Sequence, residues 1–372
     1  MRVGFIGWRG MVGSVLRARM TEEGDWAGLE PVFFSTSSPG GPPPEAPGAA
    51  HAPPPLQDAF DLDVLRSCDV LVTCQGSSWT LQMHPALRGA GWQGVFIDAA
   101  SALRMAPEST IVLDPINAPL IQRAMVAGKK DYIGGNCTVS LLLMGIGGLI
   151  SSGLVRFVST MTYQAASGGG ARKMVELVRQ MHDLGAAGVA VADTMGGLGV
   201  SEVVTQRMRA AEHPTSAIGS PLAANLLPWI DKPMPGGQSR EEWKGQAEST
   251  RILDLDTPVP IDGIAVRVGS LRCHAQGVTI GLNRPAELSE LEDIIRNTSP
   301  WTRLIDNTPD ATRSQLTPAA VTGTLDVPVG RLRRLGTSPD HICLFTLGDQ
   351  LLWGAAEPLR RMLTIWRTHA EG

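Results

Sequence analysis

Residues 2–13 read RVGFIGWRGMVG, and they decide the fold class of this 372-residue chain. The first six residues form a short apolar run that is typical of a buried strand, and apolar residues at helical spacing follow from Met11. Gly7, Gly10 and Gly13 lie between the strand and the helix. A dinucleotide fingerprint needs glycines there for a tight turn, for close approach of the pyrophosphate and for helix–strand contact. The segment therefore predicts a strand–turn–helix unit that binds a dinucleotide.

Five further strand-like runs continue this alternation; they lie at 31–34, 69–73, 94–97, 110–113 and 131–133. The segments between them are long enough to hold crossover helices, which predicts a parallel, doubly wound α/β sheet. Beyond about residue 134 the pattern changes, because helical stretches mix with longer strands at 156–164, 259–268 and 277–283. We therefore expect a second, α+β domain, followed by a closing helix at 349–367.

Composition excludes several classes of protein. The 32 Lys and Arg and 36 Asp and Glu leave a net charge of -4 without a long basic run, so we expect no nucleic-acid partner. The longest apolar stretch, 140–155, is interrupted by glycines and serines, which argues against a membrane span. Residues 1–20 lack the features of a secretory signal, so we expect the chain to stay in the cytoplasm.

The five cysteines do not predict a disulfide framework or a metal site, because their number is odd and no Cys-x-x-Cys pair occurs. Eight prolines lie between residues 39 and 55. That composition forms neither strand nor helix and predicts an extended surface loop.

The end of the second strand indicates which dinucleotide is bound. It reads Ser35-Thr36-Ser37-Ser38, without the acidic residue that would hold a free ribose 2′-hydroxyl. Hydroxyl donors with Arg9 nearby suit a 2′-phosphate instead. The sequence therefore favours NADP over NAD.

Cys137 differs from the other cysteines in its context. It follows the last strand of the alternation, within Gly134-Gly135-Asn136-Cys137-Thr138-Val139-Ser140, and precedes an apolar helical run at 141–150. The partial positive charge and free N–H groups of a helix N-terminus lower the pKa of a thiol and can stabilise an oxyanion. We therefore expect Cys137 to be nucleophilic, whereas Cys68, Cys74 and Cys343 fit small buried hydrophobic residues.

Two other motifs stay open on their residues alone. The glycine run 168–170 can expose N–H groups to a ligand, admit another backbone or simply turn the chain. His274 can be an acid/base group or a structural histidine, and Arg267 and Arg272 can be surface charges.

Taken together, these motifs resemble the aspartate-β-semialdehyde dehydrogenase family of the proteobacterial type along nearly the whole chain. The resemblance runs in order through residues 3–13, 31–37, 72–76, 134–140, 163–172, 228–232, 238–248, 267–274, 316–323 and 348–361. It fades at 39–55 and at about 185–220. The family makes a cofactor contact just after Ala190, and because the resemblance fades at 185–220, this contact is left unassigned.

The resemblance implies a Rossmann-like NADP-binding domain at 1–133, completed by a C-terminal helix at 349–372. A catalytic, substrate-binding and dimerisation domain is expected at 134–348, in a homodimer. The implied reaction is the NADPH-dependent reductive dephosphorylation of L-aspartyl-4-phosphate to L-aspartate-4-semialdehyde through a cysteine thioester. This step serves lysine, threonine, methionine and diaminopimelate biosynthesis.

The resemblance also implies roles for single residues. Cys137 resembles the nucleophile and His274 the acid/base group; Gln164, Glu241 and Arg267 resemble substrate-orienting residues, and Arg104 and Lys244 the pair that holds phosphate. The residues that resemble the NADP-contacting set are Arg9, Gly10, Met11, Val12, Thr36, Ser37, Gln75, Ser167, Gly168 and Gln350.

Two alternatives remain at this point. N-acetyl-glutamyl-phosphate reductase uses the same chemistry on an acylated amine, whereas a carboxylate such as Glu241 suits a free α-ammonium. A regulator that binds NADP without turnover would leave Cys137 an ordinary thiol, so the alkylation rate of Cys137 with and without NADP separates the two.

Overall fold

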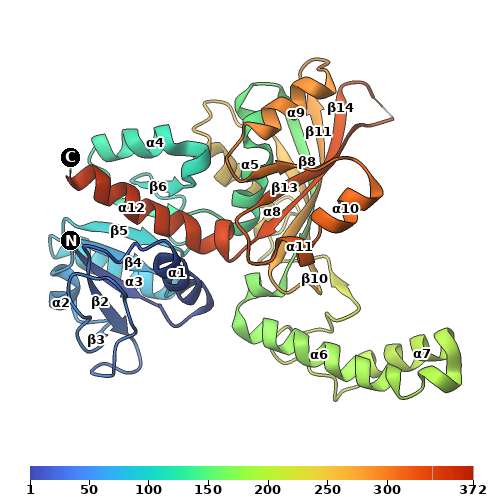
Figure 1. The fold of residues 1–372 in the computed structure, drawn as a ribbon, viewed down its shortest axis with the longest axis horizontal. Coiled ribbons are helices and arrows are strands. Elements are labelled where there is room, and N and C mark those ends of the chain that lie inside the picture. Colours follow the sequence, from blue (N-terminus) through green and yellow to red (C-terminus); the bar gives the residue numbers. More distant parts are fainter. Residues whose placement is uncertain (337, 372) are drawn as a thin grey trace.

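The computed structural model describes residues 1–336 and 338–371, and in this part the chain forms two seven-stranded sheets (Figure 1). The first sheet is parallel throughout, with the order β3-β2-β1-β4-β5-β7-β6. The second is mixed, with the order β12-β13-β14-β11-β8-β10-β9. The predicted fold class, a doubly wound α/β unit with a second α+β unit, is confirmed.

The first sheet and its helices occupy the first third of the chain. Their bounds are β1 Arg2–Ile6, α1 Met11–Glu22, β2 Glu30–Ser35, β3 Gln57–Asp58, α2 Leu62–Arg66, β4 Val70–Thr73, α3 Ser77–Gly89, β5 Val95–Asp98, β6 Ser109–Val112, α4 Asp114–Val126 and β7 Asp131–Gly134. Strand β1 lies between β2 and β4, so the direction of strand order reverses beside it. In doubly wound sheets a ligand crevice opens at the carboxyl ends of the strands at such a reversal.

The second sheet follows a long buried helix. The elements are α5 Cys137–Ser151, β8 Val155–Gln164, η1 Ala166–Gly169, α6 Ala171–Val189, α7 Ala192–Arg209, β9 Leu226–Leu227, α8 Arg240–Ile252, β10 Ile261–Val268, β11 Cys273–Leu282, α9 Leu288–Arg296, β12 Thr302–Leu304, α10 Pro309–Gln315, α11 Pro318–Val321, β13 Val327–Arg334 and β14 His341–Asp349. Helices α5 and α8 pack on one face of this sheet. The opposite face carries exposed apolar side chains, among them Met161 and Ile264.

The predicted start of the closing helix at residue 349 is wrong. Strand β14 runs to Asp349, because its residues pair in antiparallel register with β11 as far as Cys273 opposite Asp349. A turn of π-helix, η2 Leu352–Ala356, follows, and α12 Glu357–Glu371 begins after it. Leu359 and Met362 of α12 are buried against the core of the first sheet, so the C-terminal helix returns to the N-terminal unit (Figure 1).

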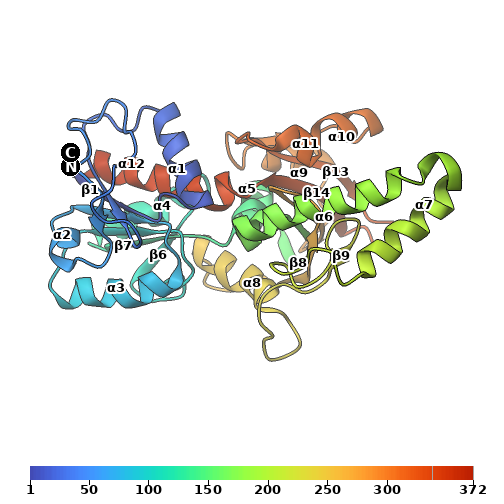
Figure 2. The ribbon, with the colours of Figure 1, turned by 90° about the horizontal axis from the view of Figure 1, so that it is seen from below.

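Helices α6 and α7 form a pair that projects from the body of the molecule (Figure 2). Most of the divergent segment at 185–220 lies here. The Arg207 guanidinium of α7 donates to both carboxylate oxygens of Asp183 on α6, at 2.7–2.9 Å, and this ion pair ties the helices together. No helix among the described residues is both long and apolar enough to cross a membrane.

The proline-rich segment 39–55 is a surface loop, as predicted, and none of its residues is buried. It is held near its ends, where the Gly40 N–H donates to Leu56 O at 2.7 Å and the Ala50 N–H donates to Leu29 O at 2.9 Å.

Candidate active site

Cys137 is the first residue of α5 and lies where the chain leaves the first sheet for the second unit. Asn136 caps this helix, because its side-chain oxygen accepts hydrogen bonds from the backbone N–H groups of Thr138 at 2.9 Å and Val139 at 3.1 Å. The cap fixes the first turn of the helix and with it the position of the thiol.

The Cys137 sulfur lies 3.3 Å from Nε2 of His274, at the start of β11. The backbone N–H of Ala165 donates to the other ring nitrogen, Nδ1, at 3.0 Å. Because Nδ1 already accepts this hydrogen bond, proton exchange between the ring and the site is confined to Nε2. The structure thus places the predicted nucleophile beside an oriented imidazole, an arrangement that a covalent mechanism requires.

The expected lowering of the Cys137 pKa is wrong for the site as it stands. Burial raises the pKa of the thiol to about 11, and the carboxylate of Glu241 acts in the same direction, against the cations Arg104 and Arg267. A helix N-terminus contributes only about 0.3–1 kcal/mol at exposed positions, whereas burial can move a pKa by several units. Burial also lowers the pKa of His274 to about 3, with Arg267 adding to the effect. The resting pair is therefore a thiol and a neutral imidazole.

A cleft of about 950 Å³ opens beside this pair. Its lining includes Cys137 and all three expected substrate-orienting residues, Gln164 at the end of β8, Glu241 in the first turn of α8 and Arg267 near the end of β10. Arg267 donates to Ala165 O at 2.6 Å, so the backbone of one residue, Ala165, contacts both Arg267 and His274. The fold brings together residues that lie more than a hundred positions apart.

Glu241 is held as a carboxylate. Burial alone would raise its pKa, but the Lys244 ammonium, which donates to Oε2 at 2.8 Å, outweighs burial and holds the pKa well below its ordinary value. Asn136 Nδ2 and Thr138 Oγ1 donate to Oε1 at 3.0 and 3.2 Å. A permanent negative charge in the cleft favours a ligand with a cationic group.

The two expected phosphate-binding residues lie in different places. Lys244 lines the cleft, where its Nζ is also 3.0 Å from a carboxylate oxygen of Asp231. Arg104 is buried outside the cleft lining and donates to Gly134 O at 2.6 Å, to Ala99 O at 3.2 Å and to Glu248 at 3.3 Å. A phosphate role for Arg104 stays a prediction, because its guanidinium already has these partners.

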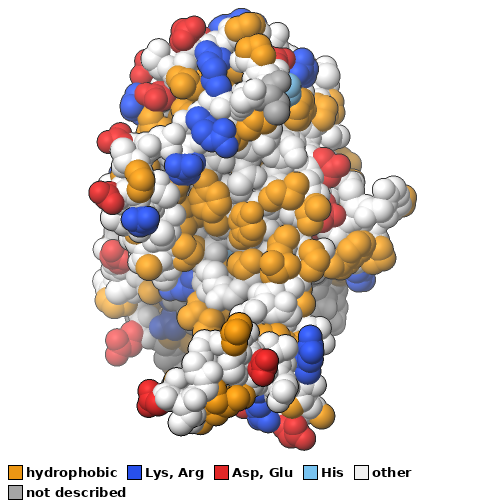
Figure 3. All heavy atoms as spheres, turned by 90° about the vertical axis from the view of Figure 1, so that its right-hand side faces the viewer, with side chains coloured by type: hydrophobic (Ala, Val, Ile, Leu, Met, Phe, Trp, Pro, Cys, Tyr) orange, Lys and Arg blue, Asp and Glu red, His pale blue; other side chains and the backbone are white. Residues whose placement is uncertain are grey.

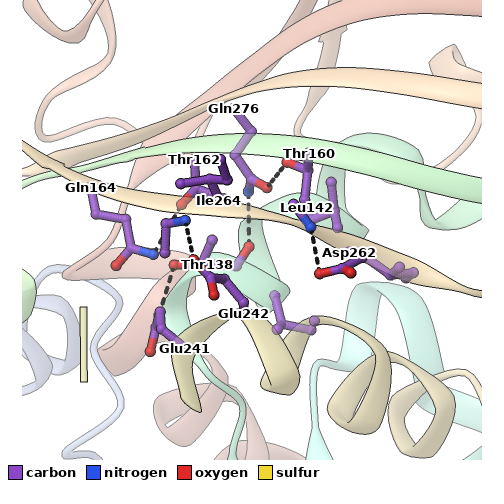
Figure 4. Close-up of a pocket in the computed structure, with 15 residues that line it drawn as sticks. Thr138, Leu142, Thr160, Thr162, Gln164, Glu241, Glu242, Asp262, Ile264 and Gln276 are labelled. Atoms are coloured by element: carbon purple, nitrogen blue, oxygen red, sulfur yellow. Dashed lines mark hydrogen bonds between the residues drawn. The ribbon is translucent and has the colours of Figure 1, made fainter. Parts of the chain in front are cut away.

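A polar layer behind the cleft supports the first turn of α5 (Figure 4). Gln276 Nε2 donates to Thr138 O at 2.9 Å, and its Oε1 accepts from Thr160 Oγ1 at 3.2 Å. Figure 4 shows these side chains pointing from the strands toward Glu241 and Thr138. The helix end that carries the thiol is thus tied to β8 and β11.

A second cleft, of about 610 Å³, lies at the carboxyl ends of β1, β2 and β4. The expected cofactor residues in its lining are Arg9, Gly10, Thr36, Ser37 and Gln75. Met11 and Val12 begin α1 directly beside it. The Arg9 guanidinium stacks 4.7 Å above the Trp8 ring and donates to Ser38 Oγ at 3.0 Å, at the end of β2.

The glycines of this cleft fit a dinucleotide. A Cβ on Gly7, whose φ is +75°, would stand 2.5 Å from the Cys74 carbonyl carbon, and a Cβ on Gly13 would stand 2.4 Å from Gly7 O. Both positions therefore require glycine. Gly10 caps α1, and the nearest atom to a Cβ there is 3.4 Å away, which leaves the helix N-terminus open to a pyrophosphate.

The remaining expected cofactor residues lie near the thiol instead. Gln350 Nε2 donates to Ser167 Oγ at 2.8 Å. A Cβ on Gly168 would stand 3.1 Å from His274 Nε2, so Gly168 lies against the ring that contacts Cys137. The expected cofactor residues form two groups. One lines the cleft at the carboxyl ends of β1, β2 and β4, called the β1–β4 cleft below, and the other lies beside Cys137. A dinucleotide has two ends that could contact these two groups.

Sequence reasoning missed two residues of the site. Gly354, in η2, lies so close to the thiol that a Cβ on it would stand 2.8 Å from Cys137 Cβ. Lys173, in the first turn of α6, lines the same cleft as Cys137. No spacing pattern joins residues 137 and 354, whereas the glycines before Lys173 were a usable signal.

Comparisons with known proteins agree with this arrangement. Residues 2–124 match the family model described as semialdehyde dehydrogenase, NAD binding domain, and residues 146–353 match semialdehyde dehydrogenase, dimerisation domain. A solved structure of aspartate semialdehyde dehydrogenase from Francisella tularensis is 45% identical, with a TM-score of 0.93, over 99% of this chain and 100% of that chain.

More distant solved structures share the fold. Aspartate semialdehyde dehydrogenase II from Vibrio cholerae, complexed with ASA, is 21% identical over 99% of this chain and 98% of that one, with a TM-score of 0.78. Aspartate semialdehyde dehydrogenase with NADP from Candida albicans is 16% identical over 98% of both chains, with a TM-score of 0.64.

Proposed function

The chain belongs to the semialdehyde dehydrogenase family, and from this premise we propose that it is an NADP-dependent phosphorylating dehydrogenase of aspartate semialdehyde. In the biosynthetic direction it reduces L-aspartyl-4-phosphate to L-aspartate-4-semialdehyde and releases phosphate. The observation that carries the proposal is the Cys137–His274 pair at 3.3 Å, beside Arg267 and Glu241 in one cleft.

In the first step Cys137 attacks the acyl phosphate. A bond forms between Sγ and the acyl carbon, and the bond from that carbon to the phosphate oxygen breaks with its electron pair. The thiol, whose pKa is raised by burial, gives up its proton, and the departing phosphate takes one up. His274 Nε2, next to the sulfur, is the group through which this proton moves. The product is a thioester on Cys137.

Substrate orientation rests on two charged residues. Arg267 can bind the α-carboxylate through two parallel hydrogen bonds, and the Glu241 carboxylate attracts the free α-ammonium. An N-acetylated substrate has no such cation and would leave the buried charge of Glu241 without its ligand. This favours aspartate semialdehyde over N-acetyl-glutamate semialdehyde.

The cofactor residues of the β1–β4 cleft, with Arg9 and the hydroxyls at the end of β2, suit the 2′-phosphate end of NADP. Ser167, Gly168 and Gln350 would then lie at the nicotinamide end, beside Cys137. When bound, NADPH supplies the hydride that reduces the thioester. Collapse of the reduced adduct releases the aldehyde and the Cys137 thiolate, which takes up a proton to restore the thiol.

We also propose that the protein is a homodimer that forms through the outer face of the second sheet. Met161 and Ile264 are 38% and 46% exposed on adjacent strands of that face. Figure 3 shows apolar side chains gathered in a band across this side of the molecule. A contiguous exposed apolar surface of this kind is typical of an interface.

We further propose that the protein is located in the cytoplasm. Its reaction would serve the biosynthesis of lysine, threonine, methionine and diaminopimelate.

The test is phosphate-dependent reduction of NADP with aspartate semialdehyde, with N-acetyl-glutamate semialdehyde as the control substrate. We expect turnover with the first aldehyde, little with the second, and no steady-state turnover without phosphate. Preference for the acetylated aldehyde would assign the chain to the other reductase. Binding of NADP without turnover of either aldehyde would indicate a regulator.

A further inference from the structure

Lys173 is directed into the substrate cleft by the glycine run that precedes it. Side chains of an α-helix point toward its N-terminus, so a lysine in the first turn of α6 lies over the residues before the helix. A Cβ on Gly169 would stand 2.6 Å from Cδ of Lys173, which shows that the lysine stem passes directly over this glycine. Lys173 then joins Cys137 and Arg267 in the lining of the cleft.

Among the charged residues that line the cleft, Lys173 has an ammonium group that is available to bind a ligand. The charged residues of the lining are two carboxylates, Asp231 and Glu241, and three cations, Lys173, Lys244 and Arg267. Lys244 forms ion pairs with both carboxylates. Lys173 forms no ion pair and no side-chain hydrogen bond within residues 1–336 and 338–371.

The substrate brings more negative charge than the other cations can neutralise. An acyl phosphate carries about two negative charges on its phosphoryl group, besides the α-carboxylate that Arg267 is expected to bind. Arg104 is held by Glu248 and two carbonyl oxygens outside the cleft lining, and Lys244 is shared by two carboxylates. A phosphoryl group in this cleft needs a further donor.

We propose that Lys173 is a phosphate-binding residue, whose ammonium group donates to a phosphoryl oxygen of the acyl phosphate and of inorganic phosphate. This inference rests on the proposed function and assigns one more residue to its phosphate site. Lysine suits this task as a compact charge on a flexible stem, able to approach the phosphate and to release it after the thioester forms.

The test compares Lys173→Met with Arg172→Met, which removes the same charge from an exposed position in the same turn of α6. The assay is NADP reduction with aspartate semialdehyde at varied phosphate concentration. We expect Lys173→Met to raise the KM for phosphate by about tenfold or more, the effect of losing one charge-assisted hydrogen bond. The KM values for aldehyde and NADP should stay near those of the unaltered enzyme, and Lys173→Arg should keep most of the phosphate affinity.

A second readout needs no turnover. Phosphate should slow alkylation of Cys137 in the unaltered enzyme, and Lys173→Met should need about tenfold more phosphate for the same protection. An unchanged phosphate dependence in both measurements would overturn the proposal, as would a rise in the KM for aldehyde or NADP instead. Absence of phosphate-dependent activity in the unaltered enzyme would contradict the proposed function itself, so the two failures are distinguishable.

Discussion

At the scale of single residues, burial controls the chemistry of the site more than local sequence does. The sequence around Cys137 predicts a helix N-terminus, and the helix is present, but the pKa of the thiol is raised because desolvation exceeds the effect of the helix end. The His274 ring is oriented by the backbone of Ala165, which no side-chain motif could indicate.

The first prediction concerns the pH dependence of Cys137 alkylation. With a thiol pKa of about 11, the reactive thiolate is a small fraction near neutral pH and increases as the proton is lost. The rate with iodoacetamide should therefore rise about tenfold per pH unit between about pH 7 and 9 in the ligand-free enzyme. His274, with a pKa of about 3, should add no inflection near neutrality. Peptide mass spectrometry measures the rate; a plateau reached near pH 7 would mean a thiolate at rest.

The second prediction concerns cofactor choice. Ser37→Asp places a carboxylate where the 2′-phosphate is expected, so it should weaken NADPH much more than NADH. Arg9→Ala should weaken NADPH by about 1–3 kcal/mol if the guanidinium reaches the phosphate.

Arg17→Ala is the matched control, because Arg17 also stacks on the Trp8 ring, at 5.3 Å, but does not line the cleft. The measurement is the ratio of kcat/KM for the two cofactors. An unchanged ratio in both Ser37→Asp and Arg9→Ala would mean that the adenosine ribose binds elsewhere.

At the scale of elements, the helices and strands whose pattern is local in the sequence could be predicted. The first strand, glycine turn and helix, and the strands that follow them, carry their periodicity within a few residues. Strands β13 and β14 and the turn η2 were not predicted. Strand β14 pairs with β11, at least 60 residues earlier, and β13 and η2 pack against α5, which lies still earlier in the chain. The other site residues were predicted from motif blocks. Gly354 was identified only from the fold, whereas Lys173 was overlooked although it follows the glycine run 168–170.

The third prediction tests the contact between η2 and α5. Gly354→Ala places a methyl group 2.8 Å from Cys137 Cβ and 3.2 Å from Gln350 Cβ, so the start of α5 or the turn must shift. We expect a loss of about 1–3 kcal/mol in the free energy of unfolding and a fall in kcat of about 10²-fold, since displaced reacting groups are costly.

Gly185→Ala is the matched control, because a Cβ at this position in α6 meets no atom within 4 Å. It should keep full activity and gain about 0.4–1 kcal/mol in stability. Urea unfolding and steady-state kinetics measure both effects. Normal activity in Gly354→Ala would show that the thiol tolerates a shift of the turn.

At the scale of the whole molecule, the second sheet is covered by α5 and α8 on one face. On the other face α11 covers only part of β11 and β14, and Met161 and Ile264 stay exposed. A sheet of this size needs both faces covered or one face polar, and Met161 and Ile264 are not polar. We propose that a second copy of the chain covers this apolar surface.

The fourth prediction follows from this surface. Met161→Asp should convert the proposed homodimer into monomers, because each interface would bury two unpaired carboxylates, one from each copy. The control is Val126→Asp, which adds the same charge at a 73% exposed position on α4 of the first unit. Sedimentation equilibrium gives the masses. A Met161→Asp protein that remains dimeric would place the interface elsewhere.

In the proposed mechanism, Cys137 carries the acyl group during turnover. The direct measurement mixes enzyme, NADP and aspartate semialdehyde without phosphate, then combines the amplitude of NADPH formation with peptide mass spectrometry after acid quench. We expect a burst of one NADPH per active site and a β-aspartyl thioester on Cys137 that disappears when phosphate is added. Cys137→Ser should give neither signal but should still bind NADP. A burst in Cys137→Ser, or an acyl group on another residue, would contradict the account.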